Sequence, residues 1–164
     1  MSDKHRKESI VKIACCQMEP IVGNKSDNLG KSIQMIEEAA SNGANLIVLP
    51  ELCNSGYVFE TREEAFELSE EIPSGESCKS WSKICKKLGV HIVAGINERV
   101  GDLLYNSSVV IGPNDYVGTF RKVHLWNEEN LFFEPGDLGF PVFKTPIGRI
   151  SCHICYDSWF PESY

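Results

Sequence analysis

The sequence predicts an α/β domain in which helices cover a mixed β-sheet. Short apolar runs with the length of buried strands alternate with amphipathic stretches of helical period through the first half of the chain. In the second half, strand-like runs follow one another, separated by turn residues. The composition, with 42% hydrophobic and 24% charged residues, is that of an ordinary folded domain. Together these observations favour a layered α/β fold.

The first half begins with a strand, a helix and a second strand. Residues 10–16 form a short apolar run with one lysine, which predicts a strand covered on both faces. A loop at 23–27 ends in helix-capping residues, and Gly43 predicts where the helix stops. Residues 46–49 give the second buried strand. The apolar face of the helix consists of Leu29, Ile33, Ile36 and Ala40.

A second unit repeats this rhythm and then runs into consecutive strands. We expect a short helix at 63–71 within an acidic, solvated stretch, a longer helix starting at 77 or 78 and ending at 88, and a strand at 90–97. A long loop covers 121–140, and Pro161 is expected to open a helix. Further strands are predicted at 105–111, 116–120, 142–145 and 149–154.

The length and charge exclude several classes of protein. A chain of 164 residues corresponds to one domain. With 16 Lys and Arg against 23 Asp and Glu, the net charge of −7 argues against a nucleic-acid partner. No apolar run approaches the roughly 18 residues of a membrane span, so no membrane partner is expected. Residues 1–8 are charged, which predicts a flexible tail rather than a secretory signal, ahead of a domain at 9–164.

The cysteine content indicates the compartment. Seven cysteines are an odd number, whereas secreted disulfide frameworks are usually even and short. We therefore expect a reducing, cytoplasmic setting in which most thiols act as small buried hydrophobes. Cys53 either lines the functional site or is an ordinary loop thiol. The cysteines expected in packing roles are Cys15, Cys16, Cys78, Cys85 and Cys152.

Three chemically active side chains come directly after predicted strands. Glu51 follows the strand at 46–49 and its closing proline, Lys122 follows the strand ending at Phe120, and Cys155 follows the strand at 149–154. Ligands bind at the carboxyl ends of strands in α/β sheets, so these positions are candidates for chemistry. If they converge, the carboxylate could take the proton of the thiol nucleophile and the ammonium could stabilise developing negative charge.

Three short segments resemble the signatures of the nitrilase superfamily of carbon–nitrogen hydrolases, in the family's order. These segments are Leu49-Pro50-Glu51, Phe120-Arg121-Lys122-Val123-His124-Leu125 and Ile154-Cys155-Tyr156-Asp157. Flanking matches are Gly56-Tyr57, Phe133-Glu134-Pro135-Gly136-Asp137 and Phe160-Pro161-Glu162. The resemblance covers residues 9–164. It implies an αββα sandwich, of which this chain would hold the N-terminal portion only, since the family continues well past the cysteine. The sequence therefore predicts a truncated chain.

The resemblance also implies the roles of individual residues. Glu51 would be the general base, Lys122 the cationic stabiliser and Cys155 the nucleophile of a Glu-Lys-Cys triad. The second glutamate of the family fits Glu129 best, with Glu128 as the other register. The backbone N–H of Tyr156 would join Lys122 as an oxyanion donor. Tyr57 and Trp126 are expected to contact the substrate. The alternative for Trp126, as for Phe132 and Phe133, is that it only anchors the loop at 121–140.

The implied reaction is hydrolysis of a small amide or N-carbamoyl compound through a Cys155 thioester, with release of ammonia. The resemblance implies no metal and no organic cofactor, and it implies homo-oligomers. Family members that act on nitriles usually carry Trp-Glu after the cysteine, whereas this chain has Tyr156-Asp157. That difference favours amide or carbamoyl substrates over nitriles.

Three alternatives remain open from the sequence. The first is nitrile hydrolysis by the same triad. The second is a truncated, non-catalytic binding or assembly module. The third is a redox role for the C-x-x-C pair Cys152 and Cys155. The expected position of Cys152 inside a strand argues against this role. His124 is expected to have a structural hydrogen-bonding role.

Overall fold

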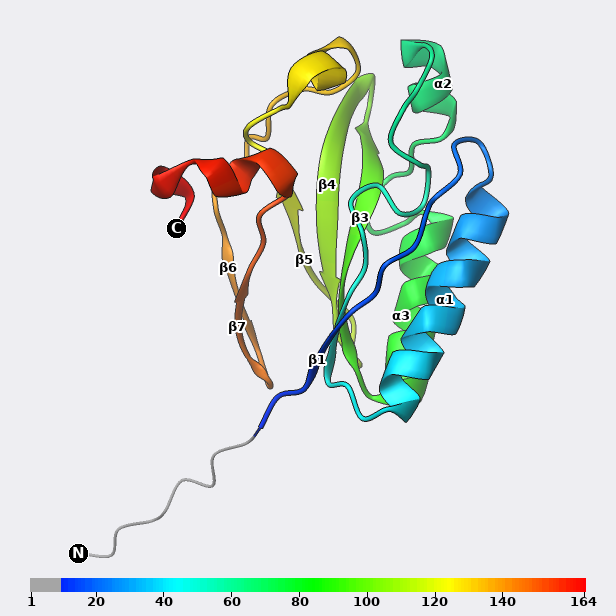
Figure 1. The fold of residues 1–164 in the computed structure, drawn as a ribbon, viewed down its shortest axis with the longest axis vertical. Coiled ribbons are helices and arrows are strands. Elements are labelled where there is room, and N and C mark those ends of the chain that lie inside the picture. The colour runs from blue at the N-terminus through cyan, green and yellow to red at the C-terminus, as the bar shows by residue number, and fades with distance from the viewer. Residues whose placement is uncertain (1–9) are drawn as a thin grey trace, which may run out of the picture.

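The computed structural model describes residues 10–164 and has a mixed five-stranded sheet at its centre (Figure 1). The strand order follows the sequence from β1 to β5; β1, β2 and β3 are parallel, and the β3–β4 and β4–β5 pairs are antiparallel. The predicted tail at 1–8 lies outside the described residues. The strands are β1 (Ile13–Cys15), β2 (Leu46–Val48), β3 (His91–Val100), β4 (Leu103–Ile111) and β5 (Tyr116–Arg121). The predicted α/β class with a mixed sheet is confirmed.

Two helices, α1 (Lys25–Ser41) and α3 (Glu76–Leu88), cover one face of this sheet (Figure 1). Trp81 of α3 is fully buried between them, and its indole N–H donates to the Ser32 hydroxyl of α1 over 2.9 Å. Gly43 has φ +82°, a left-handed conformation that ends the helix as predicted. Burial of this apolar helix layer against β2 and β3 forms the main core.

The opposite face of the sheet is partly covered by a hairpin of β6 (Val142–Thr145) and β7 (Gly148–Ser151) (Figure 1). A second core lies beneath it. This core contains Val110, Phe120, Cys152 and Ile154. Three short 3₁₀ turns, at Asn127–Leu131, Cys155–Trp159 and Pro161–Ser163, follow the strands at one end of the sheet. These turns place the segments after β5 and β7 beside the loop after β2.

Several predicted boundaries were wrong for tertiary reasons. The first strand is shorter than 10–16 and is not covered on both faces, because the β6–β7 hairpin packs over β3, β4 and β5 while β1 lies at the opposite edge; Cys15 is exposed rather than packed. The last strand ends at Ser151, not at 154, because the chain leaves the hairpin there to pack on the sheet. Pro161 opens a 3₁₀ turn of three residues.

The acidic stretch also differs from its predicted solvated helix. Helix α2 spans only Arg62–Glu67, capped by the Thr61 side chain. The chain then turns so that the backbone of Glu70 forms an isolated parallel β-bridge with Glu98 on β3, and Glu70 is buried. Within residues 10–164, no helix combines the length and apolarity needed to cross a bilayer.

Candidate active site

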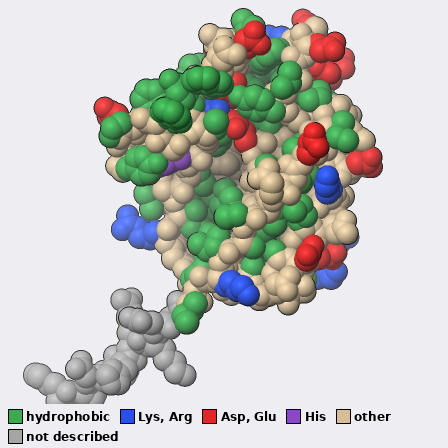
Figure 2. All heavy atoms as spheres, in the orientation of Figure 1, with side chains coloured by type: hydrophobic (Ala, Val, Ile, Leu, Met, Phe, Trp, Pro, Cys, Tyr) green, Lys and Arg blue, Asp and Glu red, His purple; other side chains and the backbone are tan. Residues whose placement is uncertain are grey.

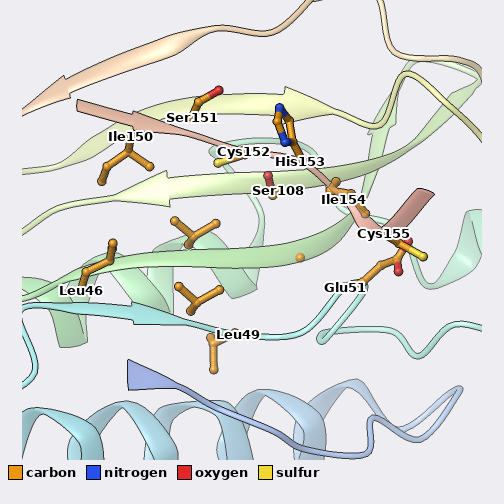
Figure 3. Close-up of a pocket in the computed structure, with 13 residues that line it drawn as sticks. Leu46, Leu49, Glu51, Ser108, Ile150, Ser151, Cys152, His153, Ile154 and Cys155 are labelled. Atoms are coloured by element: carbon orange, nitrogen blue, oxygen red, sulfur yellow. The ribbon is translucent and has the colours of Figure 1, made fainter. Parts of the chain in front are cut away.

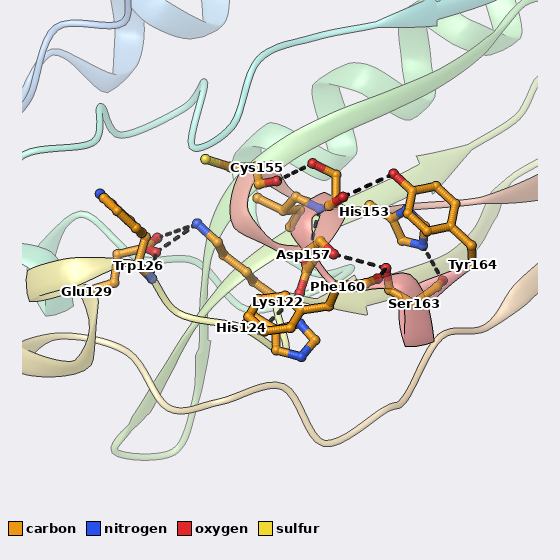
Figure 4. A network of polar contacts seen from close by, with 12 residues as sticks. Lys122, His124, Trp126, Glu129, His153, Cys155, Asp157, Phe160, Ser163 and Tyr164 are labelled. Atoms are coloured by element: carbon orange, nitrogen blue, oxygen red, sulfur yellow. Dashed lines mark hydrogen bonds and ion pairs between the residues drawn. The ribbon is translucent and has the colours of Figure 1, made fainter.

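A buried lysine with two carboxylates lies where β2 and β5 end. Lys122 follows β5, and its side chain is 0% exposed. Its Nζ donates to Glu51 Oε1 over 2.8 Å and to Glu129 Oε1 and Oε2 over 2.9 and 2.7 Å. Figure 4 shows the two contacts between Lys122 and Glu129. An ammonium has three N–H donors, so all three are directed at carboxylates.

Asn106 of β4 completes this group and was not among the site residues predicted from the sequence. Its Nδ2 donates to Glu51 Oε1 and to Glu129 Oε1, each over 2.7 Å. We call Lys122, Glu51, Glu129 and Asn106 the Lys122 cluster. A polar amide within the apolar 105–111 run was the available signal, since a buried amide needs hydrogen-bond partners.

The cluster keeps Lys122 charged. Burial lowers the pKa of Lys122, but the hydrogen bonds and negative charges of Glu129 and Glu51 raise it by a larger amount, so the pKa lies above its ordinary value. The choice of Glu129 over Glu128 as the partner of Lys122 agrees with this geometry: Glu129 is buried on the cluster, whereas Glu128 is exposed.

Cys155 lies beside the cluster on an exposed turn. Figure 3 shows its sulfur next to the carboxylate of Glu51, and both residues line the same cavity. Burial and the charge of Glu51 raise the pKa of the thiol, while Lys122 and a hydrogen bond from the Tyr156 N–H act in the opposite direction. The sequence-predicted side chains of Glu51, Lys122 and Cys155 are thus brought together.

The backbone is strained at three positions near the cluster. Leu52, Asn127 and Cys155 have φ values of +46°, +49° and +46°, and they are the non-glycine residues with positive φ in the described part of the chain. Such conformations cost on the order of 1–3 kcal/mol each and concentrate at functional sites. Close packing supports Glu51 from behind, because a Cβ at Gly95 would collide with Pro50 O and Leu52 N.

The carboxylate of Asp157 fixes the Cys155 turn against the segment after Lys122. Asp157 is 0% exposed and accepts from the backbone N–H of Ile154 over 3.1 Å and of His124 over 2.9 Å. The His124 ring contacts the same carboxylate over 2.9 Å and stacks on Phe160 with ring centroids 3.8 Å apart. His124 therefore has the structural role predicted for it (Figure 4).

Two cavities flank the cluster. One, of about 270 Å³, runs from Glu51 and Cys155 along the apolar sheet face beneath the hairpin. The other, of about 180 Å³, has an aromatic lining that includes Tyr57 and Trp126 and reaches Glu129. Figure 2 shows the hollow face, where hydrophobic side chains gather. Burial and the charges of Glu129 and Glu51 raise the pKa of Tyr57, so its hydroxyl is a proton donor beside the carboxylates.

Cys152 and Cys53 lie outside the Lys122 cluster, although Cys152 lines the same cavity as Cys155. Cys152 is buried in the core beneath the hairpin, just after β7 rather than within a strand, and burial raises the pKa of its thiol. Cys53 is also buried, and its thiol donates to the Gly95 carbonyl over 3.2 Å. Among residues 10–164, no group of three or more His, Cys, Asp or Glu side chains is arranged to hold a metal ion.

The chain belongs to the carbon–nitrogen hydrolase family, whose sequence profile matches residues 12–164. A protein named nitrilase from Pyrococcus abyssi is 48% identical over 154 residues, which cover 94% of this chain and 59% of that protein. An omega-amidase from Xenopus laevis is 38% identical, with 84% of this chain and 52% of that protein covered.

An N-carbamoylputrescine amidase from Arabidopsis thaliana is 33% identical, over 84% of this chain and 48% of that protein. The chain thus spans about half the length of the curated relatives it matches. The crystal structure of Nit3 from Saccharomyces cerevisiae superposes with a TM-score of 0.82 at 28% identity and covers 93% of this chain and 58% of that one. The nitrilase-type fold predicted from the motifs is confirmed by this similarity.

Proposed function

We propose that the protein hydrolyses a small, non-peptide amide or N-carbamoyl compound through a thioester on Cys155. One observation carries the proposal: an exposed thiol lies beside a buried ammonium and two carboxylates. This arrangement supplies a nucleophile, a base and a cation, the groups that acyl transfer requires.

In the first step, Glu51 takes the proton of Cys155 and the sulfur attacks the carbonyl carbon. The S–C bond forms and the carbonyl electron pair moves to oxygen. Lys122 and the Tyr156 N–H stabilise this oxyanion, each contact being worth about 3 kcal/mol in comparable sites. Because all three Lys122 donors contact carboxylates, one of its two contacts with Glu129 has to be released to reach the oxyanion.

In the second step, the C–N bond breaks. The leaving nitrogen takes the proton that Glu51 received from Cys155, either directly or passed on through Glu129, and departs as ammonia. Water then attacks the thioester carbon with Glu51 as its base, and the Cys155 sulfur leaves with the returned proton. Tyr57 and Trp126 are proposed to contact the substrate from the aromatic cavity. The steps balance with no metal or organic cofactor.

The substrate class rests on the residues after the nucleophile. Tyr156-Asp157 favours amides and N-carbamoyl compounds, and relatives are named omega-amidase and N-carbamoylputrescine amidase. Nitrile hydrolysis is a second candidate, because the relative at 48% identity is named nitrilase. A cytoplasmic location and homo-oligomers remain part of the proposal. The location is supported by seven cysteines, none of them in a disulfide.

The test measures ammonia release by the protein expressed from its complete open reading frame. The substrates are matched primary amides, N-carbamoyl amines and nitriles, and the variants are Cys155→Ala and, as a matched control, Cys152→Ser. We expect release from amides or carbamoyl compounds that falls at least ~10³-fold in Cys155→Ala and stays near wild type in Cys152→Ser.

Three other results would change this conclusion. Faster release from nitriles would favour the second candidate. Equal loss in both cysteine variants would favour the redox role of the C-x-x-C pair. No release above Cys155→Ala on any substrate would favour the non-catalytic binding module.

A further inference from the structure

We propose that Asn106 is a positioning residue that holds Glu51 and Glu129 ionised side by side and turns Glu51 toward Cys155. The inference rests on the proposed function, in which Glu51 must be an ionised base. Asn106 is buried on β4 and contributes both its side chain and its backbone to the Lys122 cluster.

The hydrogen-bond geometry uses both protons of the Asn106 amide. Each is directed at one carboxylate, with Nδ2 2.7 Å from Glu51 Oε1 and 2.7 Å from Glu129 Oε1. The backbone carbonyl of Asn106 accepts from the backbone N–H of Lys122 over 2.8 Å. One residue thus fixes both carboxylates and the start of the segment that carries the ammonium.

The charges explain why a neutral donor is needed. The cluster has two carboxylates but one ammonium. Two carboxylates that share one ammonium repel each other, because like charges disfavour ionisation. An amide offers two donors without adding charge, so it offsets that repulsion and continues to hold both carboxylates when Lys122 releases one contact to reach the oxyanion. An aspartate in its place would supply only further negative charge.

The same contacts orient Glu51. Its Oε1 accepts from both Lys122 and Asn106. Within the described chain no hydrogen bond reaches Oε2, and the carboxylate lies next to the Cys155 sulfur (Figure 3). The Oδ1 of Asn106 is buried without a partner there. Flipping the amide would place this oxygen against two carboxylates, so the carboxylates define its orientation.

The adjacent strand offers a matched control. Asn97 of β3 is directly opposite Asn106 in the β3–β4 register and is also buried. Its Nδ2 donates to the backbone carbonyl of Ala65 over 2.7 Å, and its Oδ1 is likewise buried without a partner among the described residues. The two amides therefore differ chiefly in what they bind: two carboxylates or one peptide carbonyl.

The experiment compares Asn106→Leu and Asn106→Asp with Asn97→Leu in the protein expressed from its complete open reading frame. Asn106→Ala serves if the leucine variant does not fold, as judged by circular dichroism. For Asn106→Leu we expect kcat to fall ~100-fold with KM within about threefold, and the acid limb of kcat/KM to move up by about one pH unit. Asn106→Asp is expected to move the acid limb of the kcat/KM profile to a still higher pH. Asn97→Leu should lose stability but keep the wild-type pH profile.

A second readout does not depend on turnover. Carbon-13 NMR of the glutamate carboxyl carbons, assigned with Glu51→Gln and Glu129→Gln, follows both titrations directly. We expect one of the two carboxyls to titrate about one pH unit higher or more in Asn106→Leu than in wild type, and no change in Asn97→Leu. An unchanged carboxyl titration and pH profile in Asn106→Leu would overturn the inference, even if wild type releases ammonia. Absence of ammonia release with a shifted carboxyl titration would instead overturn the proposed function alone.

Discussion

Two buried groups in this molecule pair lysine with glutamate, and they differ in charge balance. The Lys122 cluster has two carboxylates for one ammonium and lies beside an exposed thiol and strained backbone. The second group, here called the Glu70 cluster, consists of Glu70, Lys25 and Ser77. In this cluster the Glu70 carboxylate lies 3.1 Å from the Lys25 ammonium. It also accepts hydrogen bonds from the Ser77 N–H and hydroxyl over 2.8 and 2.7 Å.

The difference separates a group that stabilises the fold from one arranged for chemistry. Glu70 connects α1 to the start of α3, and its charge is matched. Burial raises the pKa of Glu70, but the Ser77 hydrogen bonds and the Lys25 charge outweigh it, so the pKa lies below its ordinary value. An excess carboxylate, as in the Lys122 cluster, costs stability and is useful where a proton has to be moved.

Replacing the two lysines should give the largest contrast. Lys122→Met leaves two buried carboxylates without their cation, so we expect unfolding free energy to fall by about 3–5 kcal/mol and ammonia release to fall at least ~10³-fold. Lys25→Met should cost about 1 kcal/mol or less, since the partly exposed Lys25 leaves Glu70 with its Ser77 donors. Urea denaturation and ammonia assays measure both. Equal destabilisation by the two variants would mean that charge balance does not distinguish the clusters.

Neutralising the two glutamates should produce opposite effects. Glu129→Gln relieves the repulsion between carboxylates, so we expect stability within about 1 kcal/mol of wild type, or higher, and ~100-fold lower kcat. Glu70→Gln should lower stability by about 1–2 kcal/mol and leave kcat unchanged, because it weakens charge-assisted hydrogen bonds. Thermal unfolding and steady-state kinetics on the same preparations test the pair. Loss of kcat in Glu70→Gln with intact folding would contradict the structural role.

The smallest effect concerns acid stability. The folded pKa of Glu70 lies below its ordinary value of 4.5, so the unfolded state binds more protons between the two pKa values. The stability that Glu70 contributes is therefore complete above pH 4.5 and is lost as the pH falls through the folded pKa. We expect wild type to lose more stability than Glu70→Gln between about pH 5 and 3. Thermal melts across this range check the difference; parallel curves would exclude a contribution from Glu70.

Much of the fold followed from local patterns. The order of strands and helices, the mixed sheet and the boundaries of β6 were predicted, because apolar periodicity and turn residues act over a few neighbours. The boundaries of β1 and β7 were wrong, because they depend on which strands lie at an edge and where the chain leaves the hairpin. The acidic stretch was misjudged because the burial of Glu70 depends on β3 and α3, not on its own segment.

The sequence by itself determined the α/β class, the family motifs and the placement of Glu51, Lys122 and Cys155 in the segments that follow strands. It also selected Glu129 over Glu128 as the second glutamate. Only the tertiary structure decided that Asn106 contacts Glu51, 55 positions away, and that two carboxylates share one ammonium. The physical reason is range: apolar periodicity and turn residues act over a few neighbouring residues, whereas these contacts arise from strand register and packing between distant segments.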